Sequence, residues 1–423
     1  MKLKKLAAVG LAASMTLSLA ACGGSSDSDK SSEKENGGDT ITFATNVVGE
    51  RAEALEAACK AFEEETGYKV DFQAPGEKYE ELMKTKMSSN ELPDVFTTHG
   101  WSVARYSEYL MPVNDLDWAE DINEQIKPVI TDKEGNMYVL PVDMDIAGIV
   151  CNMTVLEEVG VNPDDIKTWD DFGAACDKIK AAGKTPIHMG GKDNWTIGQF
   201  FDWAAPSFYV TDDTNSQADA LKDGEFDTAT WEKVAGLMDK WVKAGYFNED
   251  VLTADYNSDT TALADGSAAF CFYGNSSVVD AHKVNPDAKI GMIAIPSASA
   301  NDEPSLIAGE DIAVGVWKDS KVQDKAIELL NYLAKPEVMK DIAEAAGNKA
   351  GLNGVDVEIG EIGTYYDKYA DVETFPYFDR EYLPSGMWDV MCATGADILA
   401  QKDGSVENAA KTMEQNFNDK YTK

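Results

Sequence analysis

The stretch between Ile41 and Phe96 alternates short apolar runs with longer amphipathic ones, and this pattern restricts the fold more than any other feature. The runs "ITFAT", "KVDF" and "PDVF" are typical of strands. Between the first two runs, Leu55 and Phe62 fall on one face of a helical pattern that Gly67 ends. Strands that alternate with helices form parallel sheets covered by helices, so we expect an α/β fold.

His99 and Trp101 directly follow "PDVF", the third expected strand. In parallel sheets of this kind, ligands bind beyond the carboxyl ends of the strands. An imidazole and an indole at that edge are therefore predicted to face a crevice. The alternative, which the sequence leaves open, is that both rings pack within a surface loop.

The chain has 423 residues, which is too long for one simple core and indicates two lobes. "MYVLPVDMDIAGIVCN" is expected to form two extended segments around an acidic break at Asp143 and Asp145. In "TWDDF", Thr168 and Asp171 have the spacing of a capping box at the start of a helix. The aromatic helix that begins at "NW" includes Trp203, which we expect in the core, and the C-terminal part is mostly helical.

The N-terminus is typical of an export signal that ends at a cysteine. A basic start, an apolar run and the small residues of "LAAC" occur in that order, and the apolar run is too short to cross a bilayer comfortably. Residues 1–21 are predicted to be a lipoprotein signal peptide, removed as Cys22 receives a lipid. Residues 22–40 are then the lipidated cysteine and a flexible polar tether. The alternative is an anchor helix that is kept.

The chain is strongly acidic. Asp and Glu number 75 against 37 for Lys and Arg, so the formal net charge is −38. Such a chain is repelled by nucleic acid and by anionic membrane surfaces. Solubility is the simpler cause of this charge, but a cationic ligand stays open.

The cysteines that follow Cys22 lie in apolar stretches and form no CxxC pair. We therefore expect buried, unpaired thiols and no metal site built from them. These residues are Cys59, Cys151, Cys176, Cys271 and Cys392.

Several segments together resemble one known family. They are "LAAC" with a polar tether, "PDVF" with a polar loop, "LPVDMDIAGIVCNMTVLEEVG", "TWDDF", "YGNSSV" and "AGEDIAVGVWKDSKVQDKAIELLNYLAKPEVMKDIAEAAG". In this order they resemble extracellular solute-binding lipoproteins of carbohydrate-type ABC importers, related to the maltose-binding group. The resemblance covers nearly the whole chain from Cys22 to Lys423.

The resemblance implies a two-lobed periplasmic-binding-protein-like fold of type II, with the sugar held between the lobes. Lobe 1 would be residues 40–146 plus 309–332, and lobe 2 would be residues 148–307 plus 333–423. The hinge would consist of the crossing segments "DIAG", "IAGED" and "YLAKP".

A sugar needs polar groups for its hydroxyls and flat rings for its apolar faces, and the resemblance assigns both kinds. Trp101 and Trp388 are expected to form a clamp from opposite lobes. Ser276 stands where the family usually has a tryptophan, which argues against maltodextrin. The implied ligand-binding residues are Glu50, Arg51, His99, Trp101, Asp143, Asp145, Asn194, Trp195, Tyr273, Asn275, Glu310, Asp311 and Trp388.

Three of these assignments have plain structural alternatives. Glu50 would serve equally as a helix cap, and Asp143 as part of a solvated turn. Glu310 and Asp311 would equally shape the hinge without touching the ligand.

The expected function is capture of a sugar, in particular an oligosaccharide, for an ABC permease on the outer side of the membrane. No enzyme activity, cofactor or resident metal is expected, and the protein is expected to be a monomer. The main alternative is a binding protein for a polyamine or another small cationic solute, because acids and tryptophans also suit a diammonium chain.

Two other classes fit less well. A glycoside hydrolase needs two carboxylates at a fixed separation, and no local signature supports such a pair. Tyr365 and Tyr366 resemble the paired tyrosines of ferric-binding relatives, but the other ligands of an iron site are missing.

Replacing the lipid-accepting residue tests the anchor. Cys22→Ala is expected to release the intact protein from the membrane fraction, because the acyl chains are its only predicted attachment. Fractionation of cells followed by immunoblotting measures this. Full retention of the Cys22→Ala protein in the membrane fraction would contradict the lipoprotein assignment.

Overall fold

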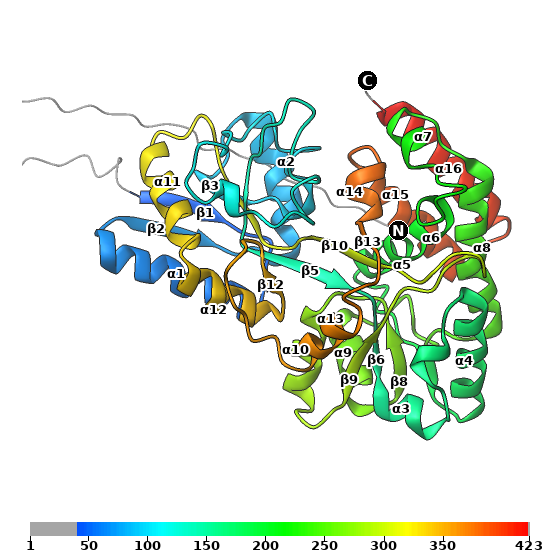
Figure 1. The fold of residues 1–423 in the computed structure, drawn as a ribbon. Helices are drawn as coiled ribbons and strands as arrows, with labels where there is room; N and C mark the ends of the chain where they lie inside the picture. The colour runs from blue at the N-terminus through cyan, green and yellow to red at the C-terminus, as the bar shows by residue number, and fades with distance from the viewer. Residues whose placement is uncertain (1–39, 422–423) are drawn as a thin grey trace, which may run out of the picture. The chain divides into compact units, whose positions relative to one another are not determined.

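The computed structural model describes residues 40–421, which form three sheets with helices packed around them (Figure 1). The first sheet has the order β2-β1-β3-β11-β4. Its strands are β1 (Thr40–Ala44), β2 (Lys69–Gln73), β3 (Val95–Thr97), β4 (Leu140–Pro141) and β11 (Ala313–Val316). Strands β1, β2 and β3 are parallel, as predicted, whereas β11 is antiparallel to both of its neighbours. The sheet is therefore mixed and not all-parallel, because β11 enters from a distant part of the chain.

The helices that accompany this sheet are α1 (Glu50–Thr66), α2 (Tyr79–Ser89), α11 (Gln323–Leu333) and α12 (Pro336–Ala346). Leu55 and Phe62 are buried on the predicted face of α1. Gly67 ends the helix with φ 79°, a left-handed conformation that favours glycine. Both α11 and α12 pack against α1.

The second sheet crosses between the other two, as Figure 1 shows for β5 and β10. Its order is β12-β5-β10-β13. The strands are β5 (Asp143–Ala147), β10 (Leu306–Glu310), β12 (Lys349–Ala350) and β13 (Thr374–Pro376). Strand β5 joins β4 of the first sheet to β6 of the third, and it pairs antiparallel with β10. The expected crossings "DIAG" and "IAGED" fall in or directly after these two strands.

The third expected crossing, "YLAKP", is instead the turn between α11 and α12. The bounds of the lobes stay predictions, but the contact between α12 and α1 favours a first lobe that extends beyond residue 332. Because α1 is amphipathic, it needs an apolar cover on its buried face, and α12 contributes to this cover.

The third sheet has the order β7-β8-β6-β9. Its strands are β6 (Ile149–Asn152), β7 (Thr185–Ile187), β8 (Ala268–Cys271) and β9 (Ile290–Ile293). The remaining helices are α3 (Met153–Glu158), α4 (Trp169–Ala181), α5 (Trp195–Ala204), α6 (Pro206–Tyr209), α7 (Ala218–Lys222), α8 (Thr228–Ala244), α9 (Tyr256–Asp265), α10 (Ser276–Val284), α13 (Glu361–Lys368), α14 (Phe378–Tyr382), α15 (Met387–Leu399) and α16 (Ser405–Lys420).

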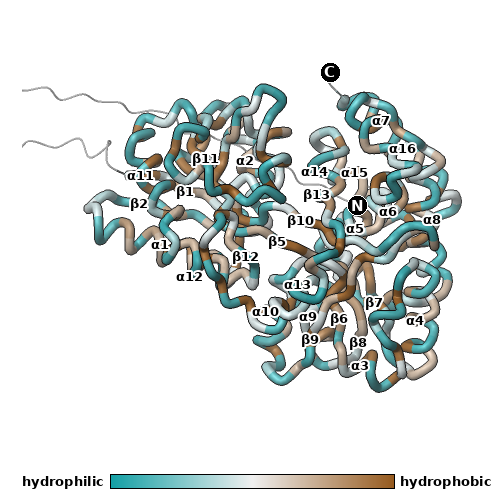
Figure 2. Tube along the Cα trace, in the orientation of Figure 1, coloured by the Kyte–Doolittle hydropathy of each residue, from teal (hydrophilic) through white to brown (hydrophobic). Residues whose placement is uncertain are grey.

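The capping box predicted at Thr168 and Asp171 is present at the start of α4. Helices α5, α8, α15 and α16 pack on one another. Trp203 on α5 is fully buried, as predicted. In Figure 2, hydrophobic residues concentrate along the strands of the third sheet, and the residues of α7 and α16 are largely hydrophilic.

The cysteines at positions 59, 151, 176, 271 and 392 are all buried and free, which confirms the expectation from the sequence. Among residues 40–421, no helix combines the length and the apolar character needed to cross a membrane. The predicted signal peptide, Cys22 and nearly all of the tether lie outside the described residues.

Candidate functional site

His99 begins a single 3₁₀ turn, His99–Trp101, directly after β3. Its φ of 51° is left-handed, which is uncommon for a residue with a side chain and is often found at functional sites. Its Nδ1 lies 3.0 Å from the carbonyl oxygen of Asp311, and its Nε2 lies 3.5 Å from Arg380 Nη2. Burial and the Arg380 guanidinium lower the pKa of His99. Both ring nitrogens thus face protein groups in this structure.

Trp101 contacts three polar side chains. Its Nε1 donates a hydrogen bond to Asp379 Oδ2 at 3.0 Å. The Arg105 guanidinium covers the ring at 4.3 Å from the centroid, and Arg105 is itself paired with Glu80 at 2.6 Å. The His99 ring lies 5.5 Å away. The polar edge of the indole is therefore held in place by protein groups.

The structure brings Trp101 and Trp388 together, with centroids 6.4 Å apart and planes at 72°. This edge-to-face contact leaves no gap for a sugar between the ring faces. The two indoles form two sides of a corner, and the expected clamp from opposite lobes stays a prediction. Trp388 lies in the first turn of α15, and Asp379 lies on α14.

Asp143 and Asp145 lie within the buried strand β5, so neither the predicted acidic break nor a solvated turn is present. Asp143 accepts hydrogen bonds from Ile312 N at 2.5 Å and Asn348 Nδ2 at 3.1 Å. Asp145 accepts hydrogen bonds from the hydroxyl of Tyr377 at 3.1 Å and from the backbone N–H of Asn275. Burial, followed by the charge of Asp311, raises the pKa of Asp143 to about 8 and that of Asp145 to about 6.

Glu310 ends β10, and Asp311, which follows it, forms an ion pair. Arg51 Nη1 lies 2.7 Å from Asp311 Oδ2. Burial would raise the pKa of Asp311, but the Arg51 guanidinium and neighbouring cations lower it below its ordinary value. Glu310 is fully buried, and neither of its carboxyl oxygens has a hydrogen bond.

Arg380 is the cation nearest to Glu310, at 3.9 Å, and it donates to the Glu310 carbonyl oxygen at 2.6 Å. Burial raises the pKa of the Glu310 carboxyl to about 7. Glu50 is exposed and lies 3.5 Å from Lys283 on α10. Arg51 is thus paired with a carboxylate, whereas the carboxyl next to Arg380 has a pKa close to neutral pH.

Trp195 heads a second group of rings at the start of α5. It is 38% exposed, and its centroid lies 5.2 Å from Tyr256 and 5.5 Å from Tyr273. Tyr273 is nearly buried, and its hydroxyl bonds to Asp259, which His188 also contacts at 2.6 Å. Part of the Trp195 ring is therefore exposed to solvent, and the buried Tyr273 packs against this ring.

The remaining predicted residues differ in their surroundings. Asn194 is exposed and does not cap α5. Asn275 is buried and donates to Tyr366, and its Oδ1 has no partner.

Sequence reasoning missed Asp202, Asp379, Arg380, Tyr377 and Tyr256. Three of them carried a readable signal. Asp202 is a charge inside the apolar helix "GQFFDWAAP", and charged residues are seldom buried unless they are paired. Asp379 and Arg380 stand together inside the aromatic run "FPYFDREY".

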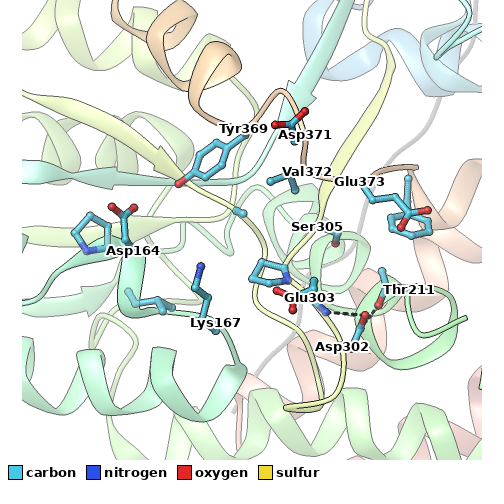
Figure 3. A pocket seen from close by; sticks show the side chains of 15 residues that line it. Asp164, Lys167, Thr211, Asp302, Glu303, Ser305, Tyr369, Asp371, Val372 and Glu373 are labelled. Carbon is cyan, nitrogen blue, oxygen red and sulfur yellow. Dashed lines mark hydrogen bonds between the residues drawn. The ribbon is translucent and has the colours of Figure 1, made fainter. Parts of the chain in front are cut away.

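A cavity of about 370 Å³ lies away from these residues, beside the starts of β10 and β13 (Figure 3). Lys167, Tyr369 and several carboxylates line it, and none of the predicted ligand-binding residues does. Asp164 at its rim is paired with Lys368, and Asp302 accepts from Thr211 at 2.6 Å. In the described part of the chain, no group of His, Cys, Asp and Glu has the arrangement of a metal site.

Comparison with known proteins gives the family. Residues 48–340 match the model of the family described as bacterial extracellular solute-binding protein. The chain is 32% identical to the melibiose/raffinose/stachyose-binding protein MelE of Bacillus subtilis, over 86% of this chain and 87% of that one.

Solved structures agree with this match. A sugar transporter from Bacillus licheniformis in complex with stachyose has a TM-score of 0.83 and 32% identity, covering 90% of this chain and 100% of that one. A binding protein MsmE from Bacillus subtilis, in an open conformation, has a TM-score of 0.80 and 29% identity, covering 90% and 98%. The two-lobed α/β fold expected from the sequence is confirmed. The chain therefore belongs to the family of bacterial extracellular solute-binding proteins.

Proposed function

We propose that this protein captures an oligosaccharide between its two lobes and delivers it to an ABC permease, outside the cell. The observation that carries this proposal is the corner formed by Trp101 and Trp388, with the Asp379 carboxylate bonded to Trp101. Rings bind the apolar faces of a sugar, and the Asp379 carboxylate holds one of these rings in place. The relatives at 32% identity are described as binding melibiose, raffinose and stachyose or as complexed with stachyose, which supports the same ligand class.

The charges of the site favour a neutral ligand. Arg51 is paired with Asp311, and Arg380 is largely buried and donates to the carbonyl oxygen of Glu310, so neither guanidinium is free for a phosphate or a carboxylate of a ligand. A polyamine would be attracted by the acids, but Asp143 and Asp145 are buried and bonded to protein donors. These contacts support a sugar over a cationic solute.

The mechanism we propose is hinge closure on the paired strands β5 and β10. Contacts between Trp101 and Asp379 and between His99 and Arg380 join the loop after β3 to α14. A ligand that touches both sides stabilises the arrangement in which they are close, and so shifts the population toward it. We propose no bond-making step, and we propose that Cys22 carries the lipid that keeps a monomer at the membrane.

A thermal-shift series tests the ligand class. Raffinose, stachyose and melibiose are expected to raise the melting temperature, and spermidine and putrescine are not. A ligand at 100 times its Kd adds about 2.7 kcal/mol to the free energy of unfolding. Stabilisation by polyamines alone, measured by differential scanning fluorimetry, would replace the sugar proposal with the cationic one.

Removal of either indole tests the corner. Trp101→Ala and Trp388→Ala are each expected to weaken binding of the best sugar at least tenfold, which is about 1.4 kcal/mol, because each ring supplies one wall. The losses of binding free energy in the two variants are not expected to add, because either substitution alone reduces the stabilisation of the closed state by the ligand. Isothermal titration measures the affinities, with Trp317→Phe, outside the proposed corner, as the control. Normal binding by the Trp101→Ala protein would place Trp101 outside the site.

The buried Glu310 carboxyl predicts a pH effect on stability. Its pKa is raised from 4.5 to about 7, so the folded protein holds a proton that the unfolded chain releases. The stability that this proton contributes is full below about pH 4.5 and is lost as the pH rises through 7. Glu310→Gln keeps the neutral form at every pH.

Calorimetry at pH 5 and at pH 8 measures this. The melting temperature of Glu310→Gln minus that of wild type is expected to be larger at pH 8 than at pH 5. Glu337→Gln, an exposed change on α12, is the control and is expected to show no such trend. A wild-type and Glu310→Gln difference that is the same at both pH values would show that Glu310 is ionised in the folded protein.

A further inference from the structure

Asp202 and Asp379 form a buried pair of carboxyl groups next to the proposed sugar corner. Asp202 lies on α5 and is 1% exposed, and Asp379 lies on α14 and is 5% exposed. Asp202 Oδ1 accepts a hydrogen bond from the backbone N–H of Asp379 at 2.8 Å. This backbone bond places the Asp202 carboxyl beside Asp379, whose own carboxyl faces Trp101. Helices α5 and α14 are neighbours in Figure 1.

Asp379 stands between Asp202 and Trp101. Its Oδ2 accepts the hydrogen bond of Trp101 Nε1 at 3.0 Å, while its backbone and carboxyl face Asp202. A single carboxylate thus connects α5 with the loop after β3. Any change in the orientation of Asp379 moves the partner that holds the Trp101 ring.

The charges around the pair do not balance if every acid is ionised. The titratable and charged groups that act on the pair are Arg105, Glu310, Tyr377, Arg380 and Cys392. Arg105 is already paired with Glu80 at 2.6 Å. Of the two arginines that act on the pair, Arg380 is therefore the one that is not already held in a close ion pair among the described residues. Buried like charges in contact do not ionise together, so protons must be held within this group.

Two differences show which of the paired acids holds the proton. Asp379 accepts the indole N–H of Trp101, which stabilises its charged form, and Asp202 has no such donor from a second side chain. Burial, followed by the charge of Asp379, raises the pKa of Asp202 well above its ordinary value. A protonated carboxyl at 202 has one acceptor for the Asp379 N–H and one donor for the Asp379 carboxylate.

We propose that Asp202 carries a proton, that it donates this proton in a hydrogen bond to Asp379, and that it thereby positions the carboxylate that holds Trp101. Asp202 is a positioning residue and does not touch the ligand. Its effect on sugar affinity rests on the proposed function, but the proton on Asp202 does not. When Asp202 loses this proton at high pH, two neighbouring carboxylates repel each other, and Asp379 no longer holds the Trp101 ring in a fixed position.

An isosteric change tests this assignment. Asn at position 202 offers the same acceptor and a permanent donor, so Asp202→Asn reproduces the protonated acid, whereas Asp202→Ala removes both groups. With raffinose as the probe, we expect the Kd of Asp202→Asn at pH 6 to be within about twofold of that of wild type, because the amide makes the same two hydrogen bonds as the protonated acid. Asp202→Ala is expected to bind at least tenfold more weakly. Asp170→Asn, an exposed change on α4, is the matched control.

The pH profile separates positioning from simple structural support. From pH 6 to pH 9, wild type is expected to lose affinity more steeply than Asp202→Asn, because only wild type has a proton to lose at this position. An Asp202→Asn protein that binds as weakly as Asp202→Ala, or whose pH profile equals that of wild type, would overturn the proposal.

A second readout needs no ligand and keeps the test independent of the proposed function. Infrared difference spectra of wild type minus Asp202→Asn at pH 7 are expected to contain the carbonyl band of one protonated carboxylic acid. The same difference taken with Asp170→Asn is expected to lack it. Absence of this band from the first difference would show that Asp202 is ionised and would overturn the proposal. Failure of every sugar to bind, with the band present, would overturn only the proposed function.

Discussion

The guanidinium of Arg380 joins segments that are far apart in the sequence, and the arrangement of the candidate site depends on it. It donates to the carbonyl oxygen of Glu310 on β10, approaches the ring of His99 after β3, and stacks on Tyr377 at 4.0 Å. The side chain needs space that two glycines provide. A Cβ on Gly100 would lie 1.9 Å from Arg380 Nε, and one on Gly309 would lie 2.9 Å from Nη1. Gly100 is thus required between the imidazole and the indole, because the arginine passes there.

This arrangement answers why a histidine and a tryptophan stand together at the end of β3. His99 is held by Asp311 and Arg380, and Trp101 is held by Asp379 and Arg105. Each ring has its polar atoms engaged by charged or carbonyl groups of the protein. The surface left for a ligand is therefore mainly ring surface, which suits the apolar face of a sugar better than its hydroxyls.

Local patterns predicted most of the first lobe, and contacts distant in sequence decided what they missed. The parallel strands β1 to β3, the glycine stop of α1 and the capping box of α4 each depend on residues within one or two turns. The sequence predicts an acidic break at Asp143 and Asp145, whereas both residues lie within β5. The donors to Asp143 are Ile312 and Asn348, 169 and 205 positions away, and no local pattern reveals them. The antiparallel β11 and the role of Arg380 were missed for the same reason.

The five buried cysteines make the lifetime of the folded state important as well as its free energy of unfolding. Burial raises the pKa of each thiol that is described, so the reactive thiolate is rare in the folded protein. Outside the cell, the surroundings favour oxidation of any exposed thiol. The protein therefore keeps its reduced cysteines only as long as opening events are infrequent, and a chain that unfolds there is exposed to disulfide cross-links that oppose its return. Its survival is set by the rate of unfolding more than by the equilibrium between its states.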